Sequence, residues 1–180
     1  QKAQQKDASK DVLESIVDEL KEGLNSAYRQ LRELLTTFRL KIEGDGLRST
    51  FEKTVSMYKE RQPNINVELK YETENVPFSP NEEIHLMQIA KEAIQNAMSH
   101  SKGTKVKVQV FNDENAKVHL KVTDNGVGIP DDPTKLNHYG LAIMQERSQS
   151  LKGQLSIKRA PLGGTEVSFE FMPEYMSVKV

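Results

Sequence analysis

The chain includes the stretch Val118-His-Leu-Lys-Val-Thr-Asp-Asn-Gly-Val-Gly-Ile-Pro130, in which a strand pattern runs into a glycine-rich turn. Apolar and polar residues alternate in its first half, which is typical of a half-buried β-strand. The strand brings Asp124 to its end, and Gly126 and Gly128 then let the backbone turn sharply and approach a ligand closely. A carboxylate here can accept a hydrogen bond from an exocyclic amine, such as that of adenine. A plain Asn-Gly turn between strands is the alternative, although a polar stretch, 131–138, follows instead of a strand.

Alternating segments on both sides of this strand predict a mostly antiparallel sheet. Residues 106–110 alternate valine with polar residues and are joined to 118–122 by Asp113-Glu114-Asn115, so we expect an antiparallel hairpin. The strands have one apolar face only, which argues against a doubly wound sheet and places the helices on one side. The other expected strands comprise residues 65–71, 155–157 and 167–171.

Three helices are expected to cover this sheet. Ser79-Pro80-Asn81-Glu82 forms a capping box with proline at the first helical position, so a helix begins here and runs to about His100, before Gly103. Residues 47–61 and 140–151 are expected to form the other two. The apolar face of the first helix consists of Leu86, Ile89, Ala90, Ala93, Ile94 and Ala97. We therefore predict an α+β fold built as a two-layer α/β sandwich.

Residues 10–42 predict a long helix that one small domain cannot bury. They contain no proline, and their apolar residues form a heptad seam with alternating steps of four and three. Such a seam indicates an antiparallel hairpin or a dimeric four-helix bundle, and a helix lying along its own domain is the alternative. The seam consists of Leu13, Val17, Leu20, Leu24, Ala27, Leu31, Leu34 and Phe38. Because Glu43-Gly44-Asp45-Gly46 breaks the helix, we expect a partial domain at residues 1–43 and a second domain at residues 44–180.

The composition excludes several classes of function. Of the 180 residues, 28% are charged and the net charge is −1, so nothing favours binding to nucleic acid or to an anionic membrane surface. The chain has no cysteine, which removes disulfides and thiolate chemistry. No apolar run approaches the roughly 20 residues that a membrane span needs. Because the chain begins with Gln1, we expect an internal fragment of a longer protein.

Glu92 and Asn96 lie four residues apart on one face of the expected helix, with His100 on the same stripe. A carboxylate and an amide oxygen at this spacing can both face a hydrated Mg²⁺, which prefers oxygen ligands and keeps several waters. An ordinary solvated helix face is the alternative interpretation.

Two further clusters contain glycine. In His138-Tyr139-Gly140-Leu141, a glycine at a helix N-terminus leaves amide groups available to phosphate oxygens, and a routine helix cap is the alternative. In Gly163-Gly164-Thr165, the hydroxyl group could reach a base or a bound water, and a hairpin turn is the alternative. The sequence contains neither a Walker A motif nor the catalytic-loop motif of protein kinases.

Taken in order, the four clusters resemble the N, G1 and G2 boxes and the closing Gly-Thr element of the histidine-kinase/Hsp90-type ATPase fold. Residues 92–100 resemble the N box and residues 124–129 the G1 box. Residues 138–147 resemble the G2 region of the subfamily whose response regulators bind DNA through a helix-turn-helix. The match extends over residues 80–173. Residues 24–40 resemble the second helix of the dimerisation and phosphotransfer domain in nitrate/nitrite sensor kinases.

The resemblance implies roles for individual residues. Asn96 would ligate Mg²⁺ and Glu92 would position the water shell of the metal, and these two would be the catalytic residues. Asp124 would hold the adenine amine. Residues 130–139 would form a lid over the phosphates, hinged at Gly140. The full set expected to bind ATP is Asn96, His100, Asp124, Gly126, Gly128, Ile129, Tyr139, Gly140, Leu141 and Thr165.

The implied reaction transfers the γ-phosphoryl group of Mg-ATP to a histidine on the dimerisation hairpin and then to a response regulator, in nitrate/nitrite signalling. None of the four histidines precedes an acidic residue, as the phosphoacceptor would, so we expect the chain to bind ATP without autophosphorylation. The implied partners are the hairpin, a second copy in the full-length protein and a response regulator with a helix-turn-helix output. The implied location is the cytoplasmic side of a bacterial inner membrane, reached through domains outside this chain.

Two alternatives use the same fold. A serine kinase of the anti-sigma-factor type would need no bundle helix, so the heptad seam at residues 10–42 argues against it. A nucleotide-gated interaction module, in which ATP only orders the lid, would carry out no phosphotransfer.

Overall fold

The computed structural model describes residues 17, 23, 46–73, 76–129, 138–161 and 163–177, without the side chains of residues 138, 139 and 177. The chain divides into two compact units, residues 1–42 and residues 43–180. Of the long helix expected at residues 10–42, only Val17 and Gly23 are described, and both are helical. Residues 130–137 of the expected lid also lie outside the described part. The assignment of residues 1–43 to a dimerisation domain therefore stays a prediction.

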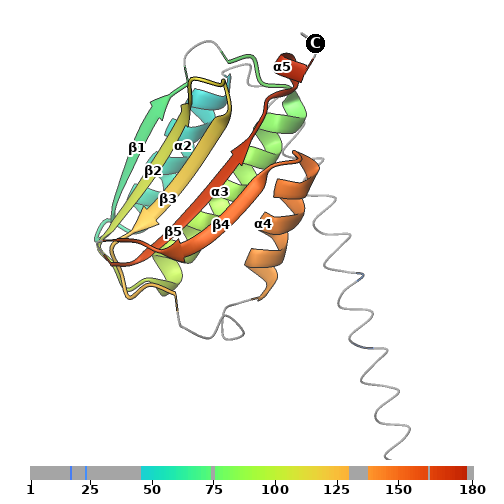
Figure 1. The fold of residues 1–180 in the computed structure, drawn as a ribbon. Helices are drawn as coiled ribbons and strands as arrows, with labels where there is room; N and C mark the ends of the chain where they lie inside the picture. Colours follow the sequence, from blue (N-terminus) through green and yellow to red (C-terminus); the bar gives the residue numbers. More distant parts are fainter. Residues whose placement is uncertain are drawn as a thin grey trace, which may run out of the picture. The chain divides into compact units, whose positions relative to one another are not determined.

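A five-stranded sheet forms the centre of the second unit, in the order β1-β2-β3-β5-β4 (Figure 1). β2 pairs antiparallel with β3, β3 with β5 and β5 with β4, while β1 runs parallel to β2. The expected hairpin is confirmed, with Val108 opposite Val122 in its register. The strands are β1 (Asn66–Glu72), β2 (Lys105–Asn112), β3 (Val118–Asp124), β4 (Gln154–Arg159) and β5 (Thr165–Phe171).

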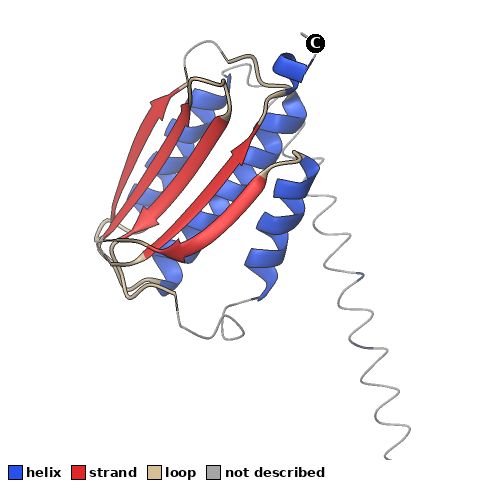
Figure 2. Cartoon of the chain, viewed as in Figure 1, coloured by secondary structure: helices blue, strands red, loops and turns tan. Residues whose placement is uncertain are grey.

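Three helices pack on one face of this sheet, as predicted (Figure 2). They are α2 (Gly46–Arg61), α3 (Pro80–His100) and α4 (His138–Ser150), and a short helix, α5 (Glu174–Ser177), ends the described chain. α4 begins two residues before the expected position. None of the helices in the described part of the chain combines the length and the apolar character that crossing a membrane requires.

The core lies between the sheet and the helices. Every second residue of β3 is buried, from Val118 to Asp124, because successive strand residues point to opposite faces. The apolar face predicted for α3 is buried, and Phe51 of α2 has no exposed surface. Removing a side chain of this size from water contributes about 1.5–3 kcal/mol. The buried face of β3 therefore points toward α3, and it carries Asp124 to the same side of the sheet.

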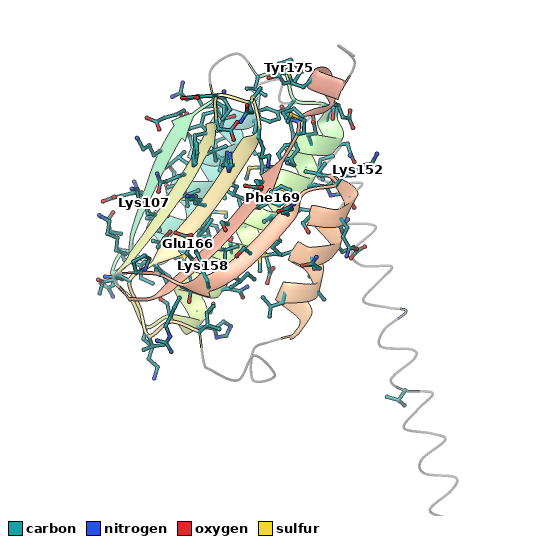
Figure 3. The ribbon with its side chains drawn as sticks, viewed as in Figure 1. Lys107, Lys152, Lys158, Glu166, Phe169 and Tyr175 are labelled. Carbon is teal, nitrogen blue, oxygen red and sulfur yellow. The ribbon has the colours of Figure 1, made fainter. Side chains whose placement is uncertain are left out.

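The outer face of the sheet is polar. Ion pairs connect neighbouring strands there, such as Lys105 with Glu68 at 2.9 Å and Lys158 with Glu166 at 3.2 Å; Lys158 and Glu166 are labelled in Figure 3. Because three of these four side chains are exposed to water, each pair contributes at most about 1 kcal/mol. The alternation of polar and apolar residues therefore orients the sheet, and the buried face does most to stabilise it.

The start of α3 is held by a buried carboxylate. The predicted capping box is present, with the side chains of Ser79 and Glu82 each bonded to the backbone of the other. Glu82 is only 1% exposed and accepts hydrogen bonds from the amides of Ser79 (2.6 Å) and Glu174 (2.7 Å). One side chain thus fixes the beginning of α3 and connects it to α5.

Candidate functional site

A pocket of about 530 Å³ lies among α3, α4, the loop after β3 and the ends of β4 and β5. Its wall is mostly apolar and carries a few polar groups, which is the usual character of a small-molecule site. The lining residues are Ala93, Asn96, Ala97, His100, Ser101, Val127, Gly128, Ile129, Leu141, Met144, Ile157, Thr165 and Val167. The residues predicted from sequence that line it are Asn96, His100, Gly128, Ile129, Leu141 and Thr165.

The predicted N-box residues meet the first turn of α4. Gly140 is buried, and a Cβ atom there would collide with Oε1 of Glu92 and lie 3.2 Å from Nδ2 of Asn96. The polar ends of Glu92 and Asn96 therefore converge on the backbone of α4, which approaches closely because residue 140 lacks a side chain. Asn96 lines the pocket, whereas Glu92 is not among the lining residues.

Asp124 ends β3 as a buried carboxylate, 5% exposed. Its Oδ1 atom accepts a hydrogen bond of 2.8 Å from the amide of Gly126. Its Oδ2 atom has no hydrogen-bond partner in the described part of the chain. Asp124 does not line the pocket itself, but it contacts Gly164, whose neighbour Thr165 does. The structure thus brings Asp124 to the side of the sheet that carries Asn96 and leaves one of its oxygens available.

Two glycines of the loop after β3 are required by close packing. A Cβ atom at Gly126 would collide with the carbonyl oxygen of Ser101, which accepts a hydrogen bond of 2.8 Å from the amide of Val127. Gly128 has φ of +77°, a conformation that other residues rarely adopt. Glycine is therefore favoured at both positions, and the approach of this backbone to a ligand stays a prediction.

Several residues of the site were missed by the sequence analysis. Ser101, at the C-terminal cap of α3, carries no pattern that would reveal its contact with the loop. Gly164, with φ of +84°, was part of a predicted cluster but was not expected to touch Asp124. The apolar wall residues, such as Met144, share the periodicity of the core, so their position at a pocket leaves no separate signal in the sequence.

Tyr139 was expected to contact the nucleotide. Its backbone lies in the first turn of α4, and its side chain lies outside the described part of the chain. Its contact therefore stays a prediction, as does the closure of the lid at residues 130–137.

The donor groups fit magnesium better than a transition metal. Among the described residues, no three His, Cys, Asp or Glu side chains come together as a metal site. Mg²⁺ instead keeps several waters and takes one or two protein oxygens. Asn96, lining the pocket, and Glu92, one helical turn before it, can supply such oxygens. Of the described lining residues, His100 is the only one with an ionisable side chain.

The sequence that forms this sheet, its helices and the pocket beside α3 matches a class of ATPases that includes histidine kinases. The chain belongs to the histidine kinase-, DNA gyrase B-, and HSP90-like ATPase family, whose sequence model matches residues 81–175. Within this family, the chain is similar to two curated sensor proteins of Escherichia coli (strain K12).

The nitrate/nitrite sensor protein NarX is 40% identical over 170 residues, which make up 94% of this chain and 28% of NarX. The nitrate/nitrite sensor protein NarQ is 35% identical over 158 residues, which make up 88% of this chain and 28% of NarQ. The chain thus spans little more than a quarter of the length of these relatives.

A solved structure shares the fold. The histidine kinase domain of the blue-light activated histidine kinase from Erythrobacter litoralis EL346 has a TM-score of 0.62 and 21% sequence identity, over 73% of this chain and 63% of that chain. The comparisons confirm the predicted sandwich, the predicted class of ATPase domain and the resemblance to nitrate/nitrite sensor kinases.

Proposed function

We propose that the pocket binds Mg-ATP and presents its γ-phosphoryl group to a histidine on a dimerisation hairpin. The observation that carries this proposal is that Asn96, from α3, and residues 127–129, from the loop after β3, line one pocket beside the start of α4. These segments are far apart in the sequence, and the family to which the chain belongs consists of ATPases.

Each part of the pocket has a role in this proposal. Asp124 accepts a hydrogen bond from the exocyclic amine of adenine through Oδ2, because Oδ1 already bonds to the amide of Gly126. Thr165 supports the same end of the site. The close backbone at Gly126 and Gly128 lets the base lie against the loop, and Ile129 contributes an apolar contact.

The phosphate end lies at α4. Asn96 supplies an oxygen for Mg²⁺ and Glu92 orients the water shell of the metal, while His100 stands at the rim. Amide groups at the start of α4, from Tyr139 to Leu141, favour negative charge, because a helix N-terminus carries a partial positive charge. When bound, the metal would neutralise the phosphate oxygens, and phosphoryl transfer depends mainly on such positioning.

The remaining steps concern the whole protein. We propose that the phosphoryl group passes from the histidine to an aspartate of a response regulator with a helix-turn-helix output. We also propose that the full-length protein is a homodimer, anchored in a bacterial inner membrane with this part on the cytoplasmic side, and that it signals nitrate or nitrite. The names of the two relatives support the nitrate or nitrite signal.

The test measures nucleotide affinity by titration calorimetry with MgATP. The change Asp124→Ala removes the proposed charged hydrogen bond to adenine, worth about 1.5–3 kcal/mol, so affinity should fall about 10- to 150-fold. It also removes the hydrogen bond from the amide of Gly126, which adds to the loss. Asp113→Ala, which changes an aspartate in the turn between β2 and β3, is the control and should leave the affinity unchanged. An equal dissociation constant for Asp124→Ala and the unchanged chain would remove Asp124 from the adenine site.

A second experiment separates the proposal from its alternatives. The chain is mixed with labelled ATP and a separate hairpin that bears the histidine. Acid-labile label on the hairpin supports histidine kinase activity. Binding of ATP without any transfer would favour the nucleotide-gated module, and acid-stable phosphoserine would favour a serine kinase.

A further inference from the structure

Hydrogen bonds hold the loop at residues 124–129 against the rest of the domain at several points. On one side, Oδ1 of Asn125 accepts hydrogen bonds from the amides of Thr104 and Lys105, both at 2.9 Å. In the middle, the amide of Val127 donates to the carbonyl oxygen of Ser101. These bonds fix the first half of the loop against the end of α3 and the start of β2.

The second half is fastened by Arg159, the last residue of β4. Its guanidinium group donates from Nη1 to the carbonyl oxygen of Val127 at 3.3 Å and from Nη2 to that of Ile129 at 2.9 Å. These carbonyls stand on either side of Gly128. A Cβ atom at Gly128 would lie 3.1 Å from Nη1, so the guanidinium packs directly against the turn that the two hydrogen bonds hold.

Val127, Gly128 and Ile129 all line the pocket, whereas Arg159 does not. Gly128 has φ of +77°, and a free glycine populates positive and negative φ about equally. Without a restraint, binding a ligand would have to order this turn, at a cost in conformational entropy. The planar fork of an arginine suits two acceptors at a fixed separation, which the single ammonium of lysine cannot match.

We propose that Arg159 is a positioning residue for the nucleotide pocket, which sets the backbone at residues 127–129 before ATP binds. This inference rests on the proposed function, because it takes the ligand to be a nucleotide. It assigns Arg159 to the loop carbonyls and not to the phosphates. Loss of Arg159 should therefore lower the affinity for all adenine nucleotides by the same factor, whatever the number of their phosphates.

The experiment compares Arg159→Met, Arg159→Lys and the control Lys158→Met in the full 180-residue chain. Lys158 is the neighbouring residue of β4, but it faces the outer side of the sheet and pairs with Glu166. Calorimetry gives dissociation constants for ATP, ADP and AMP with magnesium. Nuclear magnetic resonance of the nucleotide-free chain follows the amides of Gly126 and Gly128, and far-ultraviolet circular dichroism checks folding.

For Arg159→Met we expect all three nucleotides to bind about five- to thirtyfold more weakly, which corresponds to the entropy cost of ordering the backbone of one residue on binding. The Gly128 amide should shift or broaden in the free protein. Arg159→Lys should restore part of the affinity and part of the original Gly128 signal. Lys158→Met should change neither the affinity nor this signal. A general loss of stability would not produce this pattern, because it would not be confined to the amides of one loop.

Two results would overturn the inference. Unchanged affinities in Arg159→Met, with the unchanged chain still binding ATP, would show that the contact has no role in binding. A loss that grows from AMP to ATP would make Arg159 a direct phosphate ligand. If the unchanged chain binds no nucleotide at all, the proposed function itself fails, which is a distinct outcome.

Discussion

Gly164 provides the sharpest test of the packing around Asp124. It is buried and has φ of +84°, and a Cβ atom there would collide with the carbonyl oxygen of Asp124 and lie 2.7 Å from its Oδ1 atom. The change Gly164→Ala therefore imposes two costs. A left-handed backbone costs an L-residue about 1–2 kcal/mol, and forcing a methyl group into a packed site costs about 1–3 kcal/mol more.

Gly163 offers a matched control one residue earlier. Its φ is +94°, but the nearest atom to an added Cβ, the carbonyl oxygen of Gly126, would be 4.0 Å away. Gly163→Ala therefore carries the backbone cost without the collision, and both changes alter the unfolded chain alike. The two variants should differ in free energy of unfolding by about 1–3 kcal/mol, which is the steric contribution alone.

Urea unfolding followed by circular dichroism measures both free energies of unfolding. Gly164→Ala should be less stable than Gly163→Ala by that difference, with similar m-values. Calorimetry with MgATP should also show the larger loss of affinity for Gly164→Ala, because the added methyl group displaces Asp124. Equal stability of the two variants would refute the close contact between Gly164 and Asp124.

Two other predictions concern parts of the fold away from the pocket. Glu82→Ala leaves the part-buried amides of Ser79 and Glu174 without their acceptor, so the free energy of unfolding in urea should fall by about 2–4 kcal/mol. A loss below about 1 kcal/mol would contradict this prediction. The hydrogen bond from His119 holds the pKa of Asp113 below its ordinary value. Ionised Asp113 therefore stabilises the fold fully above its unfolded pKa of about 3.9, and this contribution is lost as the pH falls through the lowered pKa of the folded state. In His119→Phe, carbon-13 titration should find the pKa of Asp113 raised toward its ordinary value, and an unchanged pKa would exclude this cause.

Local sequence patterns were sufficient to place most of the elements. The capping box at Ser79 and Glu82 marked the start of α3, and the alternation in β2 and β3 marked a hairpin with the observed partners. Such signals are readable because burial on one face imposes a period of 3.6 or 2 on nearby residues. The parallel pairing of β1 with β2 was not predicted, since alternation is the same for either strand direction.

The sequence nominated Asn96, Asp124 and their glycines through the resemblance of residues 92–100 and 124–129 to the N and G1 boxes, because each residue type alone has an ordinary structural alternative. That Asn96 and Gly128 line one pocket was decided by the packing of α3 and α4 on the sheet. The contacts of Ser101 with Gly126, and of Arg159 with the carbonyls beside Gly128, join segments distant in the chain and follow no periodic pattern. Such contacts depend on how whole helices and strands pack against one another, so they exist only once the chain has folded.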